Sequence, residues 1–302
     1  MNPAATTQPE PTLKFDRPAQ VRAVVVAAAF ASVFYMVFRT LAYQWRSPDW
    51  SHGWLIPLFS IYLVYLRWER IRHTPVRNTW VGLVLMVASL ALYQYSLWVV
   101  KIGYLRPFSM LLCLLGVVLF LCGLPILRHI WVPWAYLFFA IPLPKGIYFM
   151  LTDPLRRIAA SVSAGLLNLI PSLDIERVGS TIAYLYQGKT GALDVADACS
   201  GMRSAMTLFA LGVAVAFISD RPAWHRVVLI ASCLPIAILA NVIRVTITTL
   251  LHVFVDPKYA GGTYHAILGL ATLMIAFGIF TGLGWVLNNL FVEEPEDEEE
   301  PA

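Results

Sequence analysis

Long apolar runs fill most of this chain, and they limit what it can fold into. A helix needs about 20 mostly apolar residues to cross roughly 30 Å of hydrocarbon. Only 13% of the residues are charged, about half the share found in soluble domains. We therefore expect an all-α polytopic membrane protein with about eight transmembrane helices. The expected spans are 21–43, 53–67, 79–100, 107–124, 130–149, 200–219, 227–252 and 264–288.

The segment between the fifth and sixth runs has a different pattern. Asp153 and Pro154 are placed like a helix start, and apolar residues then recur at helical spacing. This predicts an amphipathic helix over 150–170 that lies at the membrane interface, with a ninth span as the alternative. The next residues, up to Ala198, are expected to form two extended runs around a turn at Gly188–Gly191. Extended backbone cannot face lipid, so this small hairpin-like segment is expected in the periplasm, before the helix that follows it.

The two ends of the chain are polar and are expected to be disordered. Residues 1–20 are rich in proline and polar side chains, and residues 293–300 (EEPEDEEE) hold seven acids and no base. The net charge of +4 is therefore +11 without that acidic stretch. The sequence thus predicts a tail at 1–20, a single membrane-embedded domain at 21–292 and an acidic tail at 293–302.

Loop charges predict the orientation, because cytoplasmic loops of membrane proteins are enriched in Lys and Arg. The densest cluster lies between the second and third spans: Arg67, Arg70, Arg72 and Arg77. With this cluster in the cytoplasm, ten basic residues lie inside and four lie outside in short loops. The segment 143–198 raises the outside count to nine. Both termini are then cytoplasmic, whereas a ninth span at 150–170 would place Cys199 on the opposite side.

Four polar residues are predicted to converge on one membrane face. Cys199 opens the span 200–219, and Arg203 follows it by one helical turn on the same face. Short loops then bring Arg244 of the next span, and His265 at the start of the last span, to the same end. Intramembrane ionisable residues are costly and mark functional sites. The convergence follows from helix parity, whichever side is outside.

These residue types suit thiol chemistry. A thiolate is the reactive form of cysteine, and a helix N-terminus or a nearby cation lowers the pKa of a thiol. His265 suits general acid–base catalysis, and Arg244 suits the stabilisation of an oxyanion. Supporting roles are expected for four residues near these groups: Arg203, Asn241, Ser200 and Gly201. From the pattern alone, a thiol enzyme and a transporter or structural membrane protein both remain open.

The other three cysteines, Cys113, Cys122 and Cys233, sit inside apolar runs and are expected to pack as small hydrophobic residues. There is no Cys-x-x-Cys pair, so neither a metal site nor a disulfide framework is indicated. We expect no cofactor.

Several motifs resemble those of the exosortase/archaeosortase family of membrane-embedded transpeptidases. The matching stretches are ACSGMRS around Cys199, NVIR ending at Arg244, YHAILG around His265, WSHGWLIPLFSIYLVYLRW at 50–68, and GALDVADACSG leading to the cysteine. The resemblance covers roughly residues 45–285. Within the family, the histidine at position 265 resembles the bacterial branch, the exosortases, whose members have a histidine at this place. The combination of the cysteine block with the downstream Arg and His is specific, whereas each piece alone is weak.

The resemblance implies an activity and a location. It implies a cysteine endopeptidase or transpeptidase of the bacterial inner membrane, with catalytic residues Cys199, Arg244 and His265 facing the periplasm. Its substrates are expected to be secreted proteins with a C-terminal Pro-Glu-Pro (PEP-CTERM) motif, a transmembrane helix and a basic cluster. Cys199 is expected to form a thioester and pass the protein to an envelope acceptor. No nucleic-acid partner is expected.

A rival class is a non-enzymatic polytopic component of exopolysaccharide assembly, or a permease. This class expects Cys199 to be dispensable. The sequence leaves open whether His52 or Glu176 joins the site.

Overall fold

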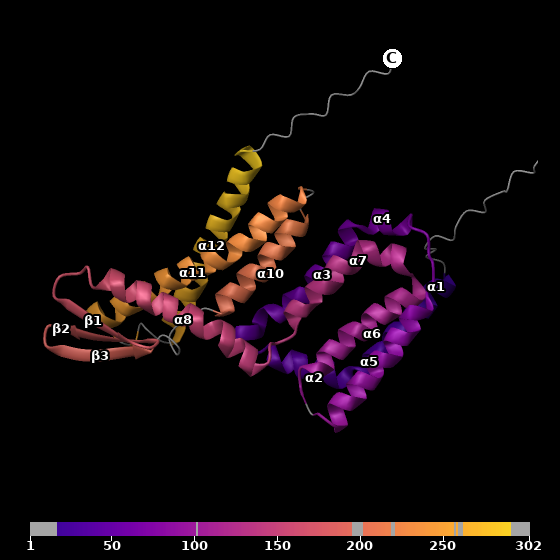
Figure 1. Ribbon diagram of the computed structural model, residues 1–302, viewed down its shortest axis with the longest axis horizontal. Helices are drawn as coiled ribbons and strands as arrows, with labels where there is room; N and C mark the ends of the chain where they lie inside the picture. Colours follow the sequence, from indigo (N-terminus) through magenta and orange to yellow (C-terminus); the bar gives the residue numbers. More distant parts are fainter. Residues whose placement is uncertain are drawn as a thin grey trace, which may run out of the picture. The chain divides into compact units, whose positions relative to one another are not determined.

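The computed structural model describes residues 17–100, 102–194, 202–218, 221–256, 258 and 262–290 (Figure 1), with backbone only for Met202, Arg203 and His265. The chain divides into two compact units, Met1–Lys145 and Gly146–Ala302, which we describe in turn.

The first unit is helical throughout its described part. Its elements are α1 (Arg17–Val33), α2 (Tyr35–Gln44), η1 (Pro48–Trp54), α3 (Leu55–Leu66), α4 (Trp68–Arg72), α5 (Trp80–Trp98), α6 (Leu105–Leu121), α7 (Leu124–Tyr136) and η2 (Leu137–Ala140). Helices α1 and α2 are bent by 67° at a break at Phe34. Phe34 is fully buried there and packs against Tyr93, with ring centroids 5.1 Å apart.

Helices α5 and α6 form the tightest pair of the first unit because glycines lie where they meet. A Cβ at Gly82 would overlap the backbone of Phe120, and a Cβ at Gly116 would lie only 2.8 Å from the backbone nitrogen of Met86. Ser89 of α5 and Ser109 of α6 are fully buried as well. Small residues at these positions let two membrane helices approach closely.

Replacing Gly82 with alanine is expected to destabilise the protein despite the better helix propensity of alanine. The methyl group meets backbone atoms, which cannot move independently, and overpacking of this kind costs about 1–3 kcal/mol. Thermal unfolding of the purified protein in detergent measures the effect. Gly278→Ala is the matched control, since Gly278 of α12 (Gly262–Leu290) has open space around its Cα. Equal midpoints for the two variants would contradict the close packing.

The second unit combines helices with a small sheet. Its elements are α8 (Lys145–Leu167), β1 (Leu173–Val178), β2 (Thr181–Tyr186), β3 (Lys189–Asp194), α10 (Met202–Ile218), α11 (Ala223–Phe254) and α12. The three strands are antiparallel in the order β1-β2-β3. Two-residue turns join them at Gly179–Ser180 and Gln187–Gly188, and Gln187 and Gly188 both have positive φ, at 50° and 75°, as the twist of a tight hairpin requires.

The predicted extended segment is confirmed as a sheet, but with three strands where we expected two. The Gly179 turn was missed, and Gly191 lies inside β3, where it pairs with Tyr184, and not in the turn. The predicted helix start at Asp153–Pro154 is wrong. Helix α8 begins at Lys145 and keeps Pro154 inside it, on an exposed position between the buried residues Thr152 and Ala159.

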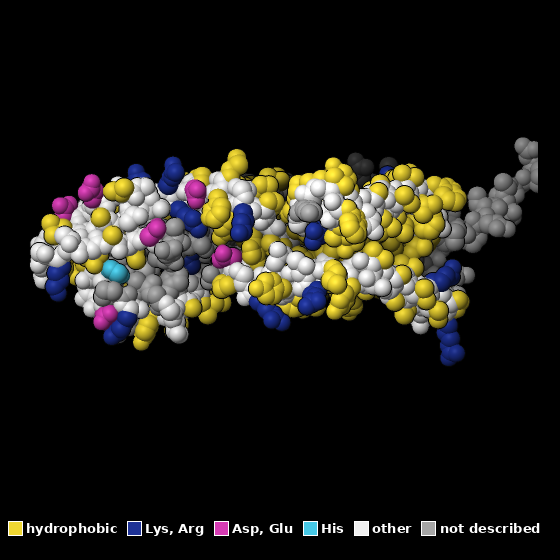
Figure 2. Space-filling model, turned by 90° about the horizontal axis from the view of Figure 1, so that it is seen from below, with side chains coloured by type: hydrophobic (Ala, Val, Ile, Leu, Met, Phe, Trp, Pro, Cys, Tyr) yellow, Lys and Arg dark blue, Asp and Glu magenta, His cyan; other side chains and the backbone are white. Residues whose placement is uncertain are grey.

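Three described helices are long and apolar enough to cross a membrane: α5, α11 and α12. The number rises to five if α1 with α2, and Leu124–Ala140 with α8, each form one span. Helices α6 and α10 are shorter, and α3 with 12 residues reaches only about 18 Å. Eight spans therefore remain a prediction. Hydrophobic side chains cover much of the surface, while acidic side chains gather over the sheet end (Figure 2), where Asp174, Glu176 and Asp194 are exposed.

Candidate functional site

Helices α10, α11 and α12 pack together, and their contacts fix which residues lie at the same level. Gly284 of α12 faces Leu229 of α11, and Gly269 faces Arg244. Positions 269 and 284 are fifteen residues apart on α12, and positions 229 and 244 are fifteen residues apart on α11. Because 284 meets 229 and 269 meets 244, the two helices run in opposite directions. Phe280 meets Gly212 of α10, which also faces Cys233 of α11. The three helices thus form one antiparallel bundle (Figure 1).

The same register shows which residues of α11 lie level with the backbones of Arg203 and His265. Gly212 of α10 faces Cys233 of α11, and the two helices run in opposite directions. Arg203 lies nine positions before Gly212, so it is level with Val242, which lies nine positions after Cys233. His265 precedes Gly269 by one turn, on the same face of α12, and lies level with Thr248. Arg244 lies between these two levels. The backbone positions of Arg203, Arg244 and His265 therefore lie toward the same end of the three helices, while the convergence of the side chains with Cys199 stays a prediction.

Arg244 is the best-defined of these residues. Its side chain is only 4% exposed, and its Nη2 donates a hydrogen bond to Oδ1 of Asn241 at 3.3 Å. Asn241 is equally buried, and its Nδ2 has no hydrogen-bond partner among the described residues. Gly269 leaves room for the guanidinium, since a Cβ there would lie 3.3 Å from Nη1. The hydrogen bond to Asn241 and the space left by Gly269 therefore hold the guanidinium of Arg244 in a fixed orientation.

Arg244 belongs to a polar face that runs toward the end of α11. Asn241, Arg244, Thr248 and His252 recur at intervals of three and four residues, so they lie on one side of the helix. Thr248 is fully buried. His252 contacts the ring of Tyr184 edge-on, with centroids 5.6 Å apart, and its Nδ1 is buried without a partner among the described residues. The sequence had singled out only Asn241 and Arg244 of this face.

Helix α8 and the sheet cover this part of α11. Oγ of Ser163 donates to the carbonyl oxygen of Val242 at 3.2 Å and accepts a hydrogen bond from Oγ1 of Thr246 at 3.1 Å. The side chain of Asn168 clamps β1 by exchanging two hydrogen bonds with the backbone of Ile175. Because β3 ends at Asp194 and α10 begins at Met202, the sheet leads into the segment that carries Cys199.

The predicted nucleophile and its neighbours, Cys199, Ser200 and Gly201, lie outside the described residues. The side chains of Arg203 and His265 are also outside the description, although their helices are placed. Cys113 and Cys233 are buried and Cys122 is half-buried, as expected for packed cysteines. The described residues include no cluster of three His, Cys, Asp or Glu side chains able to hold a metal ion.

The two residues left open by the sequence have different surroundings. Glu176 is exposed on β1 of the second unit. His52 lies in η1 of the first unit and is buried. Burial lowers the pKa of His52, and the backbone of Phe139 partly offsets that effect.

These features define a polytopic membrane protein with a polar site inside a helical bundle. Residues 44–282 match the family model for transmembrane exosortase (Exosortase_EpsH). The chain therefore belongs to the transmembrane exosortase family. Neither the curated proteins nor the solved structures contain a match.

Proposed function

We propose that this protein is a membrane-embedded cysteine protease or transpeptidase that processes C-terminal sorting signals of secreted proteins. The observation that carries the proposal is that buried Arg244 and the backbone positions of Arg203 and His265 lie toward the same end of α10, α11 and α12. Membership of the transmembrane exosortase family supports it.

The proposed first step transfers an acyl group to the enzyme. His265 takes the proton of Cys199, and the thiolate attacks the scissile carbonyl to form a carbon–sulfur bond. Arg244 stabilises the oxyanion that develops, in the orientation that its hydrogen bond to Asn241 sets. His265 then gives the proton to the leaving amine as the carbon–nitrogen bond breaks, which leaves a thioester on Cys199.

The proposed second step releases the product. An acceptor nucleophile (water or an envelope lipid or polysaccharide) attacks the thioester carbonyl, and its proton passes to His265. The carbon–sulfur bond then breaks, which releases the product and returns Cys199, reprotonated from His265. Ser200, Gly201 and Arg203 would support the thiolate at the start of α10, where unpaired backbone N–H groups favour an anion.

The substrate and the location follow from the same proposal. A substrate would carry a Pro-Glu-Pro motif, a transmembrane helix and a basic cluster at its C-terminus. The site would face the periplasm from the bacterial inner membrane, with both termini in the cytoplasm, in agreement with the positive charge of the loops.

Co-expression with a secreted reporter that bears this tail tests the proposal. Gel mobility should show the tail removed in cells that contain the wild-type protein and retained in cells that contain Cys199→Ala. The rival, a non-enzymatic component of exopolysaccharide assembly or a permease, gives no cleavage in either case and leaves transport or polysaccharide export unaffected by Cys199→Ala.

Gly269→Leu is expected to slow processing by about a hundredfold, because the larger side chain displaces the guanidinium of Arg244 by about 1 Å or more. Reporter cleavage in membrane vesicles measures the rate. Gly278→Leu, two and a half turns further along α12 in open space, is the matched control and should process normally. Equal rates for both variants would show that the position of Arg244 does not matter.

A further inference from the structure

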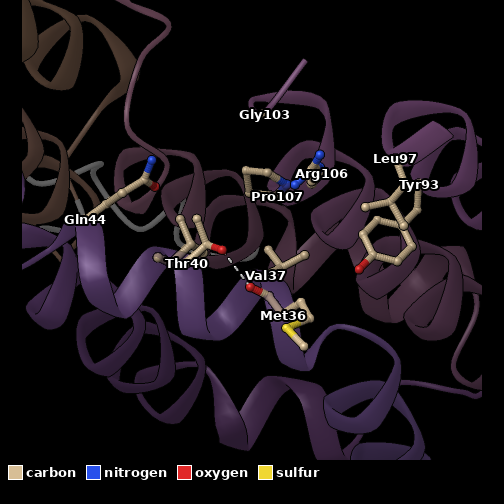
Figure 3. Close-up of a pocket in the computed structure, with 10 residues that line it drawn as sticks. Met36, Val37, Thr40, Gln44, Tyr93, Leu97, Gly103, Arg106 and Pro107 are labelled. Carbon is tan, nitrogen blue, oxygen red and sulfur yellow. Dashed lines mark hydrogen bonds between the residues drawn. The ribbon is translucent and has the colours of Figure 1, made fainter. Parts of the chain in front are cut away.

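A partly open cavity lies in the first unit, between α2, α5 and the start of α6, and holds about 460 Å³ of empty space, open solvent included (Figure 3). One part of its wall is apolar, formed by Met36, Val37, Leu97 and Pro107. Val37 and Pro107 are buried, whereas Met36 is 59% exposed, so this wall runs from the packed interior of the unit to its surface.

The rest of the wall is polar and includes one cation. Arg106, the second residue of α6, lies beside Pro107, and the hydroxyl of Tyr93 points toward Val37 (Figure 3). Nε of Arg106 is buried and has no hydrogen-bond partner among the described residues. None of the lining residues is acidic. A cation in a partly apolar cavity that offers no carboxylate is suited to an anion that arrives from outside.

The cavity lies where the helices that line it end. Helix α2 ends at Gln44, α5 ends at Trp98 and α6 begins at Leu105. The aromatic side chains at these ends are strongly exposed, with Tyr43 at 74% and Trp98 at 79%. Exposed Trp and Tyr side chains at helix ends mark the level of the lipid headgroups. We therefore expect the guanidinium of Arg106 at the depth of the headgroups, with the apolar wall running from it along α2 and α5.

We propose that this cavity binds an acidic phospholipid, with the phosphate on Arg106 and one acyl chain along Val37 and Leu97. The phosphate oxygens accept hydrogen bonds from the guanidinium. Tyr93 and Gln44 lie within the same wall and suit the polar glycerol region of the lipid. The site is separate from the sorting chemistry and does not depend on it.

Thermal unfolding of the full-length protein in neutral detergent tests the proposal. Phosphatidylglycerol is expected to raise the midpoint in a saturable manner, and phosphatidylcholine and glycerol 3-phosphate are expected to have little effect. Arg106→Gln should weaken the apparent affinity for phosphatidylglycerol by about tenfold or more. Arg46→Gln, which removes an exposed cation after α2 that does not line the cavity, should leave the affinity unchanged.

A second variant separates charge from space. Thr40→Trp keeps Arg106 but fills the cavity, so it should abolish the shift as well, even if Arg106→Gln folds poorly. An equal shift with phosphatidylcholine, or an equal loss in Arg46→Gln, would overturn the proposal. So would an equal shift with glycerol 3-phosphate, which would assign the cavity to a free anion, or an undiminished shift in Thr40→Trp.

Discussion

Cys199→Ala is expected to lower the rate of tail removal by at least about a thousandfold, because alanine offers no atom that can attack the carbonyl. The protein should still fold and insert, since the cores of both units are made by other residues. Single-turnover cleavage of a reporter in membrane vesicles measures the rate, and the thermal midpoint in detergent checks the fold.

Cys122→Ala is the matched control for that experiment. Cys122 is a half-buried thiol at the end of α6 in the first unit, and its removal should leave the rate within about twofold of wild type, as for a substitution away from the chemistry. A Cys199→Ala protein that still cleaves at the wild-type rate would refute the thiol mechanism.

Arg244→Ala is expected to cost about a hundredfold or more in the same assay. Loss of a single oxyanion donor lowers kcat by about 10²–10³, and Arg244 is buried and oriented by Asn241, so no solvent cation replaces it. Asn241→Ala should have a smaller effect, because it loosens the guanidinium without removing it.

Arg244→Lys distinguishes catalysis from structure. Lysine keeps the positive charge but loses the planar fork of donors, so we expect a thermal midpoint near that of wild type with strongly reduced cleavage. Cleavage near the wild-type rate in Arg244→Ala would exclude the role in oxyanion stabilisation. A loss of folding in both variants, with normal cleavage by the fraction that remains folded, would assign Arg244 to structure alone.

The sequence predicted the long helices well because their apolar runs are continuous. The expected spans 79–100, 227–252 and 264–288 correspond to α5, α11 and α12, each with ends within about four residues. The backbone positions of Arg203, Arg244 and His265 toward one end of these helices were expected for the same reason, while the convergence of their side chains with Cys199 stays a prediction. Short connections force neighbouring helices to run antiparallel, so position along each helix determines position in the bundle.

Other features depend on packing that a single sequence does not display. The run 21–43 is mostly apolar, yet the helix breaks at Phe34, where the ring packs on Tyr93 of a distant helix. Helix α8 passes through Pro154 while Ser163 bonds to the backbone of α11. The contact of His252 with Tyr184 joins residues that are 68 positions apart, and neither belongs to a motif.

The most direct test of the account is a search for the acyl-enzyme. A reporter whose tail is processed should be trapped on the wild-type protein, and mass spectrometry should find it joined to Cys199 through a bond that neutral hydroxylamine cleaves. We predict this adduct in the wild type and none in Cys199→Ala. His265→Ala should form little of it, because neither the deprotonation of the thiol nor the protonation of the leaving amine is assisted. Cleavage of the reporter without any adduct at Cys199 under these conditions, or an adduct at another residue, would contradict the central claim.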